Sequence, residues 1–587
     1  SYDEAMDQED LDLRAQMTKL LRQRERLAPV RLEMQGEAPA LQAMLLRRLR
    51  LTAEQSYVCT CPLVLKYAYQ LDSLDSALFY PPHAPAYPAW LDREVPMWEQ
   101  IRQRDVLLFY PYHSMQPFLD LLRQSAADPA VVSIQMTIYR VAGKSAVIKH
   151  LCAAAENGKA VTVLVELRAR FDEGNNITWA RELEEAGCRV IYGPAGYKCH
   201  GKICLITRKE KTGLSYVTQI GTGNYNEKTA ALYTDFSLLT ADRTIAADGV
   251  AFFQNMLIGD LRGSYGKLLV APVSLKQTLL RPIDGEIARG DRGRIILKTN
   301  AVTERELIDK LAEASQAGVR VDLIVRGICC LVPGVPGKTD HITVTSIVGE
   351  FLEHSRIYCL GEGALRQMYL SSADIMTRNQ ERRVEIACPV ESREVQDFLS
   401  DYLARLLGDN VKARRMLPDG GFVRAEQAGA VPVSVQQFYL DHPPQMRATE
   451  RGKGRGWRLP ELFRKRMEPF GRTGHRSFRL SPEGELTRHR LKRRCKEEQA
   501  SFLSGHSMCT GRSAIRGKFW FRLRHICPDW TYHEMGNQKQ RRRRYGGGGQ
   551  SVFPAEKTGA GGGYRAAGAV GGAGTDPQPH CPGLCGL

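Results

Sequence analysis

The sequence lacks any apolar run long enough to cross a membrane. A transmembrane helix needs roughly 20 consecutive apolar residues, and no run of even about 18 occurs here. The opening segment Ser1–Ala5 has neither the charged nor the apolar region of a signal peptide. We therefore expect a cytoplasmic protein, with peripheral membrane association as the alternative. Because the chain starts without Met, inside a polar segment, we also expect an N-terminal part to be missing.

The fifteen cysteines lack the spacing that closes a structural zinc site. Cys59 and Cys61 are closer together than the usual CxxC pair of zinc ligands. Five cysteines of the α/β-like part read as small apolar residues of strands and helices in a reducing compartment. These are Cys152, Cys188, Cys204, Cys359 and Cys388.

The first 440 residues lack a surplus of positive charge, although the whole chain has a formal net charge of +17. Of the 82 Lys and Arg and the 65 Asp and Glu, 29 and 12 respectively follow Leu440, which leaves 53 of each before it. Residues 441–587 have no helical or strand periodicity and contain runs such as Arg541–Arg544 and Gly546–Gly549. We expect no packed domain there. This tail is either a basic arm for polyanions or a non-native extension, such as a frame-shifted end of the gene.

Strand-like and helix-like segments alternate in the manner of an α/β protein. Residues 1–95 read as helical segments and a linker rich in Tyr and Pro, and residues 96–270 form the first α/β unit. Its predicted strands are Val131–Tyr139, Val161–Glu166, Arg189–Tyr192, Lys202–Thr207 and Ser215–Gly221. Helices are predicted over Ser145–Asn157 and Ile177–Ala186, the second capped by Asn175 or Asn176.

A second unit, residues 271–440, repeats the opening of the first. Its strand, helix and second strand are predicted at Arg294–Lys298, Glu304–Gln316 and Val321–Val325. Ala155–Gly158 aligns with Ser315–Gly318 at an offset of 160 residues, which indicates two similar domains. Each unit then supplies one histidine just before a strand, His200 and His354. If the units pack as a pseudo-symmetric pair, both histidines face one cleft.

Arginines follow strand ends in the first unit. Arg140 follows one predicted strand, and Arg168 and Arg170 follow the next. Open α/β sheets bind ligands at the carboxyl ends of parallel strands, and arginine holds phosphate oxygens in pairs without losing its charge. For any one of these residues, a surface ion pair with Asp172 or Glu173 is the alternative interpretation.

His200 stands between two lysines in the segment Lys198–Lys202. A neutral imidazole nitrogen is a competent nucleophile toward phosphorus, and neighbouring lysines favour the neutral form while they attract an anionic donor. A lone histidine is more often structural. Here, however, His-x-Lys precedes a strand and then Gly221–Asn226, and this pattern resembles the histidine–lysine motif of the phospholipase D superfamily, which works through a phosphohistidine.

Longer motifs resemble bacterial polyphosphate kinase of the large, phosphohistidine-forming type. In the family's order they are Thr137–Arg140, Ala169–Asn176, Gly221–Ala230, Leu232–Asp235, Arg326–Leu331 and Phe351–Arg356. The resemblance extends from near Arg14 to about Leu440. It implies an α/β (α+β) fold in which a partial head domain precedes two tandem phospholipase D-like domains. It also implies reversible transfer of the γ-phosphate of ATP to polyphosphate, which leaves ADP.

The resemblance implies a role for each matching residue. His200 would be the phosphorylated nucleophile, and His354 would act as acid or base, or bind phosphate. The residues implied to bind ATP or phosphate are Arg140, Arg170, Lys202, Tyr233, Arg326 and His354. Arg140 and Arg170 would hold phosphates around Mg²⁺, whose direct protein ligands stay open because arginine has no lone pair to give. The family also implies a homo-oligomer and no nucleic acid partner for the catalytic part.

Two motifs depart from the family pattern. Cys199–Lys202 reads Cys-His-Gly-Lys in place of Thr-His-Ala-Lys, and Ser371–Ile375 replaces Gly-Ser-Ala-Asp-Trp. Two other functions stay open. A phospholipase D-like phosphodiesterase would need two complete His-x-Lys motifs, and the second reads His-Ser-Arg at Arg356. An inactive fragment would bind polyanions through its tail, and this binding would vanish without the residues after Leu440.

Overall fold

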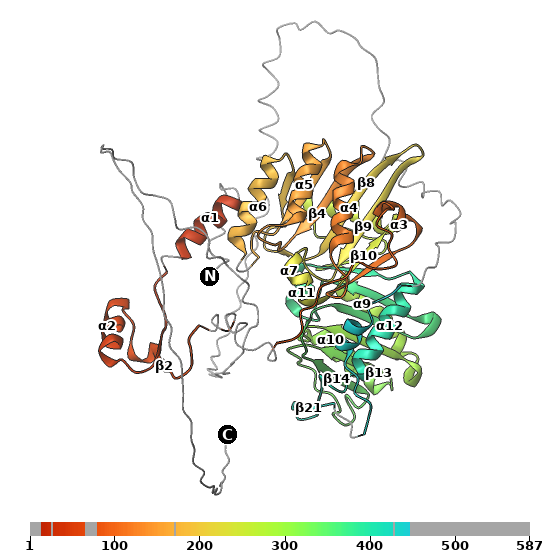
Figure 1. Ribbon diagram of the computed structural model, residues 1–587. Helices are drawn as coiled ribbons and strands as arrows, with labels where there is room; N and C mark the ends of the chain where they lie inside the picture. Colours follow the sequence, from red (N-terminus) through yellow and green to blue (C-terminus); the bar gives the residue numbers. More distant parts are fainter. Residues whose placement is uncertain are drawn as a thin grey trace, which may run out of the picture. The chain divides into compact units, whose positions relative to one another are not determined.

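The computed structural model describes residues 13–24, 27–64, 68, 79–169, 172–425 and 429–446 (Figure 1). Arg170 and residues 447–587, which include nearly all of the predicted tail, lie outside the described residues. The predicted α/β class is confirmed, because two units of alternating strands and helices make up most of the described chain. No helix among the described residues has both the length and the apolar character needed to span a membrane.

The N-terminal segment contains two helices and a small parallel sheet. Its elements are α1 (Leu13–Arg24), β1 (Leu32–Gln35), α2 (Pro39–Leu49) and β2 (Ser56–Cys59), with a 3₁₀ turn at Ala53–Gln55. β1 pairs with β2 in parallel, and α2 has no buried side chain.

The first α/β unit is built on an eight-stranded mixed sheet of order β15-β10-β9-β8-β4-β5-β6, in which β3 also pairs with β10. Its strands are β3 (Val106–Tyr110), β4 (Val131–Ile138), β5 (Ala160–Val165), β6 (Arg189–Tyr192), β8 (Lys202–Glu210), β9 (Gly213–Gly221), β10 (Tyr233–Thr240) and, from the second unit, β15 (Leu352–Glu353). Its helices are α3 (Met97–Gln103), α4 (Gln116–Ala127), α5 (Ala146–Glu156), α6 (Glu173–Glu185), α7 (Glu227–Ala230) and α8 (Arg243–Ile258).

The second unit has a nine-stranded sheet of order β11-β19-β17-β16-β12-β13-β14-β20-β21. Its strands are β11 (Leu269–Val270), β12 (Arg294–Thr299), β13 (Arg320–Val325), β14 (Ile342–Ile347), β16 (Arg356–Leu360), β17 (Gln367–Ser371), β19 (Ile386–Pro389), β20 (Ala413–Met416) and β21 (Phe422–Arg424). Its helices are α9 (Leu275–Ile287), α10 (Arg305–Gln316), α11 (Thr377–Glu381), α12 (Arg393–Gly408) and α13 (Val435–Asp441), with 3₁₀ turns at Gly290–Arg292 and Gly363–Leu365.

The predicted repeat is confirmed by the strand order. In the first sheet, parallel β4, β5 and β6 continue into antiparallel β8, β9 and β10. In the second sheet, parallel β12, β13 and β14 continue in the same way into antiparallel β16, β17 and β19. The two units therefore share one topology, and His200 and His354 precede equivalent strands, β8 and β16.

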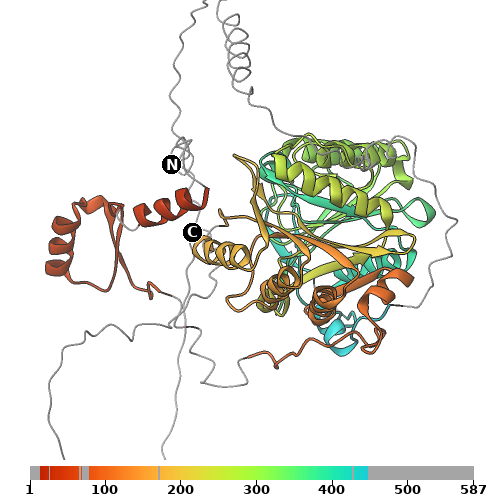
Figure 2. The same cartoon turned by 90° about the horizontal axis from the view of Figure 1, so that it is seen from above.

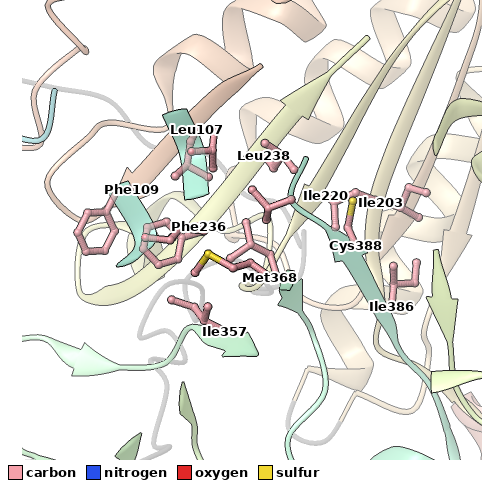
Figure 3. Close-up of a cluster of buried hydrophobic side chains, with 14 of the residues drawn as sticks. Leu107, Phe109, Ile203, Ile220, Phe236, Leu238, Ile357, Met368, Ile386 and Cys388 are labelled. Atoms are coloured by element: carbon pink, nitrogen blue, oxygen red, sulfur yellow. The ribbon is translucent and has the colours of Figure 1, made fainter. Parts of the chain in front are cut away.

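The two sheets pack against each other through their antiparallel halves. Figure 2 shows strands in the middle of the two units with helices on the outer sides. In Figure 3 the side chains between the sheets come from β3, β8, β9 and β10 on one side and from β16, β17 and β19 on the other; Phe236, Ile357 and Met368 are examples. This apolar layer is continuous across both units, so burial of apolar surface fixes how they meet.

The predicted cap of the second helix is wrong. The helix α6 begins at Glu173 after Asp172, two residues before Asn175. Asn176 lies in the first turn, where its buried side-chain amide donates to the carbonyls of Tyr139 (2.8 Å) and Glu166 (2.9 Å). Asn176 therefore ties the helix to the ends of β4 and β5, and tertiary contacts decide its place rather than its capping preference.

Candidate active site

Two short parallel strand pairs between the units bring the site together. In the first, β7 (Lys198–Cys199) pairs with β18 (Arg383–Val384), and in the second, β10 pairs with β15. Directly after the first pair, His200 follows β7 and Glu385 follows β18. Directly after the paired residues of the second pair, Asp235 comes next on β10 and His354 follows β15. Each histidine is thereby placed opposite a carboxylate from the other unit.

His200 is held by the second unit through both its backbone and its ring. Its backbone N–H and that of Gly201 donate to the carbonyl of Val384, at 2.8 and 2.9 Å. Its Nδ1 lies 2.8 Å from Oε2 of Glu385. The ring of Tyr139, at the end of β4, packs perpendicular to the imidazole with 4.8 Å between centroids. The imidazole is therefore fixed in orientation.

Glu385 is fully buried and is an acceptor for neighbouring donors. Ser372 Oγ donates to its Oε2 and Asn379 Nδ2 to its Oε1, each at 2.5 Å. Burial raises the pKa of this carboxyl, while Lys202 and Arg383 oppose the rise. An ionised carboxylate can only accept, so Nδ1 of His200 carries the hydrogen and the lone pair lies on Nε2.

The electrostatic surroundings keep His200 neutral. Burial lowers its pKa well below the usual value, and Lys202, Arg383 and Arg356 lower it further. The sequence prediction that lysines favour the neutral imidazole agrees with this for Lys202, although burial is the larger cause. A neutral ring with an unprotonated Nε2 among three cations has the properties of a nucleophile toward an anionic phosphate.

Lys202 is almost fully buried and contacts the backbone of His200. Its Nζ donates to the carbonyl of His200 and lies 5.3 Å from the ring centroid of Tyr139. Burial lowers the pKa of Lys202 to about 7. The lysine of the His-x-Lys motif is therefore a cation whose charge changes close to neutral pH.

His354 repeats the arrangement of His200 with the units exchanged. Its Nδ1 lies 2.7 Å from Oδ2 of Asp235, whose Oδ1 accepts from Thr222 at 2.6 Å. Burial lowers the pKa of His354, and Arg356 and Arg326 add to this while Asp235 opposes it. The ring of Tyr233 lies near the imidazole, with 5.4 Å between centroids. The structure thus brings together His354, Tyr233 and Asp235.

Arg356 stands in the second motif where the first has Lys202. It is buried and makes two contacts with Asp374, at 3.0 and 3.2 Å. Its Nη1 donates to the carbonyl of Thr222 and lies 3.2 Å from Nε2 of His354. An arginine therefore supplies the cation that a complete His-x-Lys motif would supply through lysine.

The segment Ser371–Ile375 serves both histidines. Ser372 supports Glu385, and Asp374 pairs with Arg356. Ser372 and Asp374 are also residues that this sequence keeps from the family pattern Gly-Ser-Ala-Asp. The departures at Ser371 and Ile375 fall on positions whose side chains do not contact either pair directly. The chemistry-bearing part of the motif is intact.

Two glycines allow the close approach of the units. A Cβ atom at Gly201 would lie 2.8 Å from the side chain of Ile386. With this side chain in place, glycine fits where the family pattern has alanine. A Cβ atom at Gly223 would lie 2.1 Å from Oδ2 of Asp235. Any side chain at Gly223 would displace the carboxylate that holds His354.

The predicted arginines have different surroundings. Arg140 follows β4 and forms an ion pair with Asp172, with Nε and Oδ2 2.8 Å apart, as the alternative interpretation anticipated. Arg168 contacts Glu166 and donates to the carbonyls of Pro194 and Tyr197, which lie in the loop between β6 and β7 that leads to His200. Arg326 follows β13 and influences the pKa of His354. Arg170 lies outside the described residues.

The sequence interpretation missed the residues that orient the histidines: Asp235, Arg356, Asp374, Arg383 and Glu385. A weak signal existed for Glu385, because it is a single acid next to the apolar strand Ile386–Pro389. No local pattern could pair it with a histidine 185 residues away. The pairing depends on β7 and β18, which have two residues each and leave no detectable periodicity.

The described residues do not form a direct Mg²⁺ site. No group of three or more His, Cys, Asp or Glu side chains converges within the described ranges. The site carboxylates Asp235, Asp374 and Glu385 are each occupied by a histidine or an arginine. Mg²⁺ prefers free oxygen ligands in octahedral geometry, so this donor set does not fit the ion by itself.

Three family models match successive parts of the chain. Residues 2–71 match the polyphosphate kinase middle domain, residues 96–260 match C-terminal domain 1, and residues 268–436 match C-terminal domain 2. The chain belongs to the polyphosphate kinase family. The two C-terminal domains of the family coincide with the two sheets, so the family's own division places His200 in one domain and His354 in the other.

Individual polyphosphate kinases are similar to this chain over most of its length. The protein of Staphylococcus haemolyticus is 43% identical over 412 residues, which cover 69% of this chain and 57% of that protein. The protein of Staphylococcus epidermidis is 39% identical, covering 79% of this chain and 62% of that protein. The crystal structure of polyphosphate kinase from Porphyromonas gingivalis matches with a TM-score of 0.65 and 34% identity, covering 71% of this chain and 64% of that one. The chain thus spans about three fifths of the length of these relatives.

Proposed function

We propose that this chain transfers the γ-phosphate of ATP reversibly to inorganic polyphosphate through a phosphohistidine at His200. The observation that carries the proposal is the buried hydrogen bond from Nδ1 of His200 to Glu385, which leaves the lone pair on Nε2 beside Lys202 and Arg383. Membership of the polyphosphate kinase family supports the choice of donor and acceptor. A phosphodiesterase and an inactive fragment have no such specific support from the geometry.

The reaction has two displacements at phosphorus. In the first, Nε2 of His200 forms a bond to the γ-phosphorus, and the bond from this phosphorus to the β,γ-bridging oxygen breaks and releases ADP. In the second, the terminal oxygen of polyphosphate attacks the same phosphorus, and the P–N bond breaks and returns its electron pair to Nε2. The cations Lys202, Arg356 and Arg383 offset the charge that gathers on the transferred group.

The remaining predicted residues would position the phosphates. Arg140 and Arg170 would hold phosphate oxygens, and Tyr233 and Arg326 would contact ATP. Burial favours the neutral form of His354, so we propose that its unprotonated Nε2 accepts a proton from the attacking terminal oxygen of polyphosphate and returns it in the reverse reaction, rather than acting as a permanent cation. Mg²⁺ would arrive on the phosphate oxygens of ATP, and no protein step depends on it. The homo-oligomer and the cytoplasmic compartment stay predictions.

Incubation with γ-labelled ATP and Mg²⁺ tests the proposal. The chain is expected to acquire a label that is labile in acid and stable in alkali, because phosphoramidates of histidine have this stability. Addition of unlabelled polyphosphate is expected to discharge the label into the polymer. A chain that acquires no label, or whose label does not pass to polyphosphate, would refute the proposed function.

The charge of Lys202 predicts how kcat/KM for ATP changes with pH. Because its pKa is about 7 in the folded protein, kcat/KM for ATP is expected to fall as the pH rises through that value. The unfolded state keeps this proton up to a pH of about 10. Between about pH 7 and about pH 10 the unfolded state therefore binds more protons at Lys202 than the folded state, so this residue makes the free energy of unfolding rise with pH. Initial rates at subsaturating ATP check the prediction, with Lys202→Arg as the comparison because arginine keeps its charge. An identical fall in the Lys202→Arg profile would contradict it.

A further inference from the structure

A basic groove lies between α1 and α6, away from the residues assigned to the reaction. Its volume is about 890 Å³. Four cations line it: Arg14, Lys19 and Arg22 from α1 and Arg181 from α6. Among the described residues that line the groove, no side chain is acidic or aromatic. The groove therefore concentrates positive charge on one side of the first α/β unit.

The two helices that form the groove are held in place by an apolar contact. Met17 of α1 is fully buried and belongs to the core cluster of the first unit, which also contains Ala180 and Leu183 of α6. Ion pairs at the rim join Arg14 to Glu184 and Arg181 to Glu185. Arg181 and Glu185 are both largely exposed, so exchanging this ion pair for a phosphate contact costs little free energy.

The groove lies further along α6 than Asp172, the residue that precedes this helix. The helix begins after Asp172, which holds Arg140. Ile177, the first groove residue on this helix, follows five residues later, which is about 8 Å along the helix axis. An extended anionic chain that leaves the surroundings of Arg140 along α6 would meet the groove cations next.

We infer that this groove binds the distal part of a long polyphosphate chain while its terminus is at His200. The inference rests on the proposed function for the identity of the polymer. A chain of phosphates is recognised mainly through its charge, and charge-assisted hydrogen bonds to the four cations of the groove would be its strongest contacts. Single-stranded nucleic acid would in addition require aromatic rings for base stacking, and none of the described residues that line the groove is aromatic.

A double substitution tests the groove in the full chain. Arg22→Ala with Arg181→Ala removes one cation from each wall, and neither residue contacts the proposed active site. The matched control is Arg123→Ala with Arg305→Ala, which removes the same charge from helices α4 and α10. Like Arg181, Arg305 is exposed and forms an ion pair four residues along its own helix.

Binding is measured by the anisotropy of end-labelled long-chain polyphosphate without ATP, and turnover by KM for long-chain polyphosphate and for tripolyphosphate. The groove variant is expected to bind the long chain about tenfold more weakly, since two charge-assisted contacts are lost. Its KM for the long chain should rise by a similar factor, while kcat and the KM for tripolyphosphate stay at parent values. The control variant should match the parent in every measurement.

Three outcomes would overturn the inference: unchanged long-chain affinity in the groove variant, an equal loss in the control variant, or an equal loss for tripolyphosphate. An oligonucleotide of equal charge is added as a competitor. If it competes as effectively as polyphosphate, and if this competition depends equally on Arg22 and Arg181, the groove would be assigned to nucleic acid instead. The binding assay needs no turnover. A chain that fails to transfer phosphate but keeps the arginine-dependent binding would refute the proposed function and leave the groove assignment standing.

Discussion

Replacement of His200 by alanine is expected to abolish both the acid-labile label and polyphosphate synthesis. Removal of a catalytic nucleophile removes the step that all later steps need, and such losses reach about 10⁴-fold or more in kcat. Neither Lys202 nor His354 is expected to replace the lost Nε2, because Nζ of the first donates to a backbone carbonyl and Nε2 of the second lies 3.2 Å from Nη1 of Arg356. Incorporation of label per chain and the rate of ADP formation are the measurements.

Two controls separate the loss of the nucleophile from a loss of folding. His341→Ala changes an exposed histidine and should leave both measurements at parent values. His354→Ala should keep the label, since Nε2 of His200 can still attack ATP, while transfer to polyphosphate slows. Full labelling of the His200→Ala chain would show that the phosphate is carried elsewhere.

Replacement of Glu385 by glutamine is expected to lower kcat by about 10²–10³-fold, because the orienting acid of a catalytic histidine sets its tautomer. Glutamine keeps the volume of the buried side chain, but its amide can donate to Nδ1 of His200. The hydrogen of the imidazole then moves to Nε2, where it blocks the attacking lone pair. KM for ATP should change little, since Glu385 accepts bonds from His200, Ser372 and Asn379 rather than facing the nucleotide.

Rapid-quench measurement of the labelling rate constant checks this prediction directly. Glu391→Gln is the matched control, because it makes the same chemical change at an exposed carboxylate whose partner is Lys267. The control should label at the parent rate. A Glu385→Gln chain that also labels at the parent rate would remove Glu385 from the account and leave the tautomer of His200 without a cause.

Exchange of carboxylates between the units makes the site dependent on their packing. His200 takes its acid from the second unit and His354 takes its acid from the first. The same strands that carry these residues pair across the boundary, and the apolar layer in Figure 3 fixes the distance between the sheets. Neither unit alone contains a complete histidine–carboxylate pair, so catalytic geometry and domain packing are one structural property.

Five strands of the first unit were predicted from their apolar runs, whereas β3 and β10 of the same sheet were not. The predicted strand Arg189–Tyr192 matches β6, and the other predicted strands of the first unit differ from the observed ones only at their ends. The repeat was visible because both units have the same order of elements. His200 could be found from its neighbours in the sequence, since His-x-Lys and the strand after it are local.

The orienting residues could not be predicted because their partners are distant in sequence. Glu385 and Asp235 gain their roles from contacts across 185 and 119 residues. Arg168 follows a strand end just as Arg140 does, yet it donates to backbone carbonyls of the neighbouring loop between β6 and β7. Position at a strand end is thus a poor guide to the direction of a long side chain, which depends on the acceptors within reach.

The isomer of the phosphohistidine tests the central claim most directly. Because Glu385 holds the hydrogen on Nδ1 of His200, the account predicts that the phosphoryl group is attached to Nε2. Alkaline digestion of the labelled chain yields the phosphopeptide, and ³¹P NMR with chromatography against both phosphohistidine standards identifies the isomer. Nε2-phosphohistidine at His200 is the predicted result. Nδ1-phosphohistidine, or the phosphate on another residue, would contradict the account.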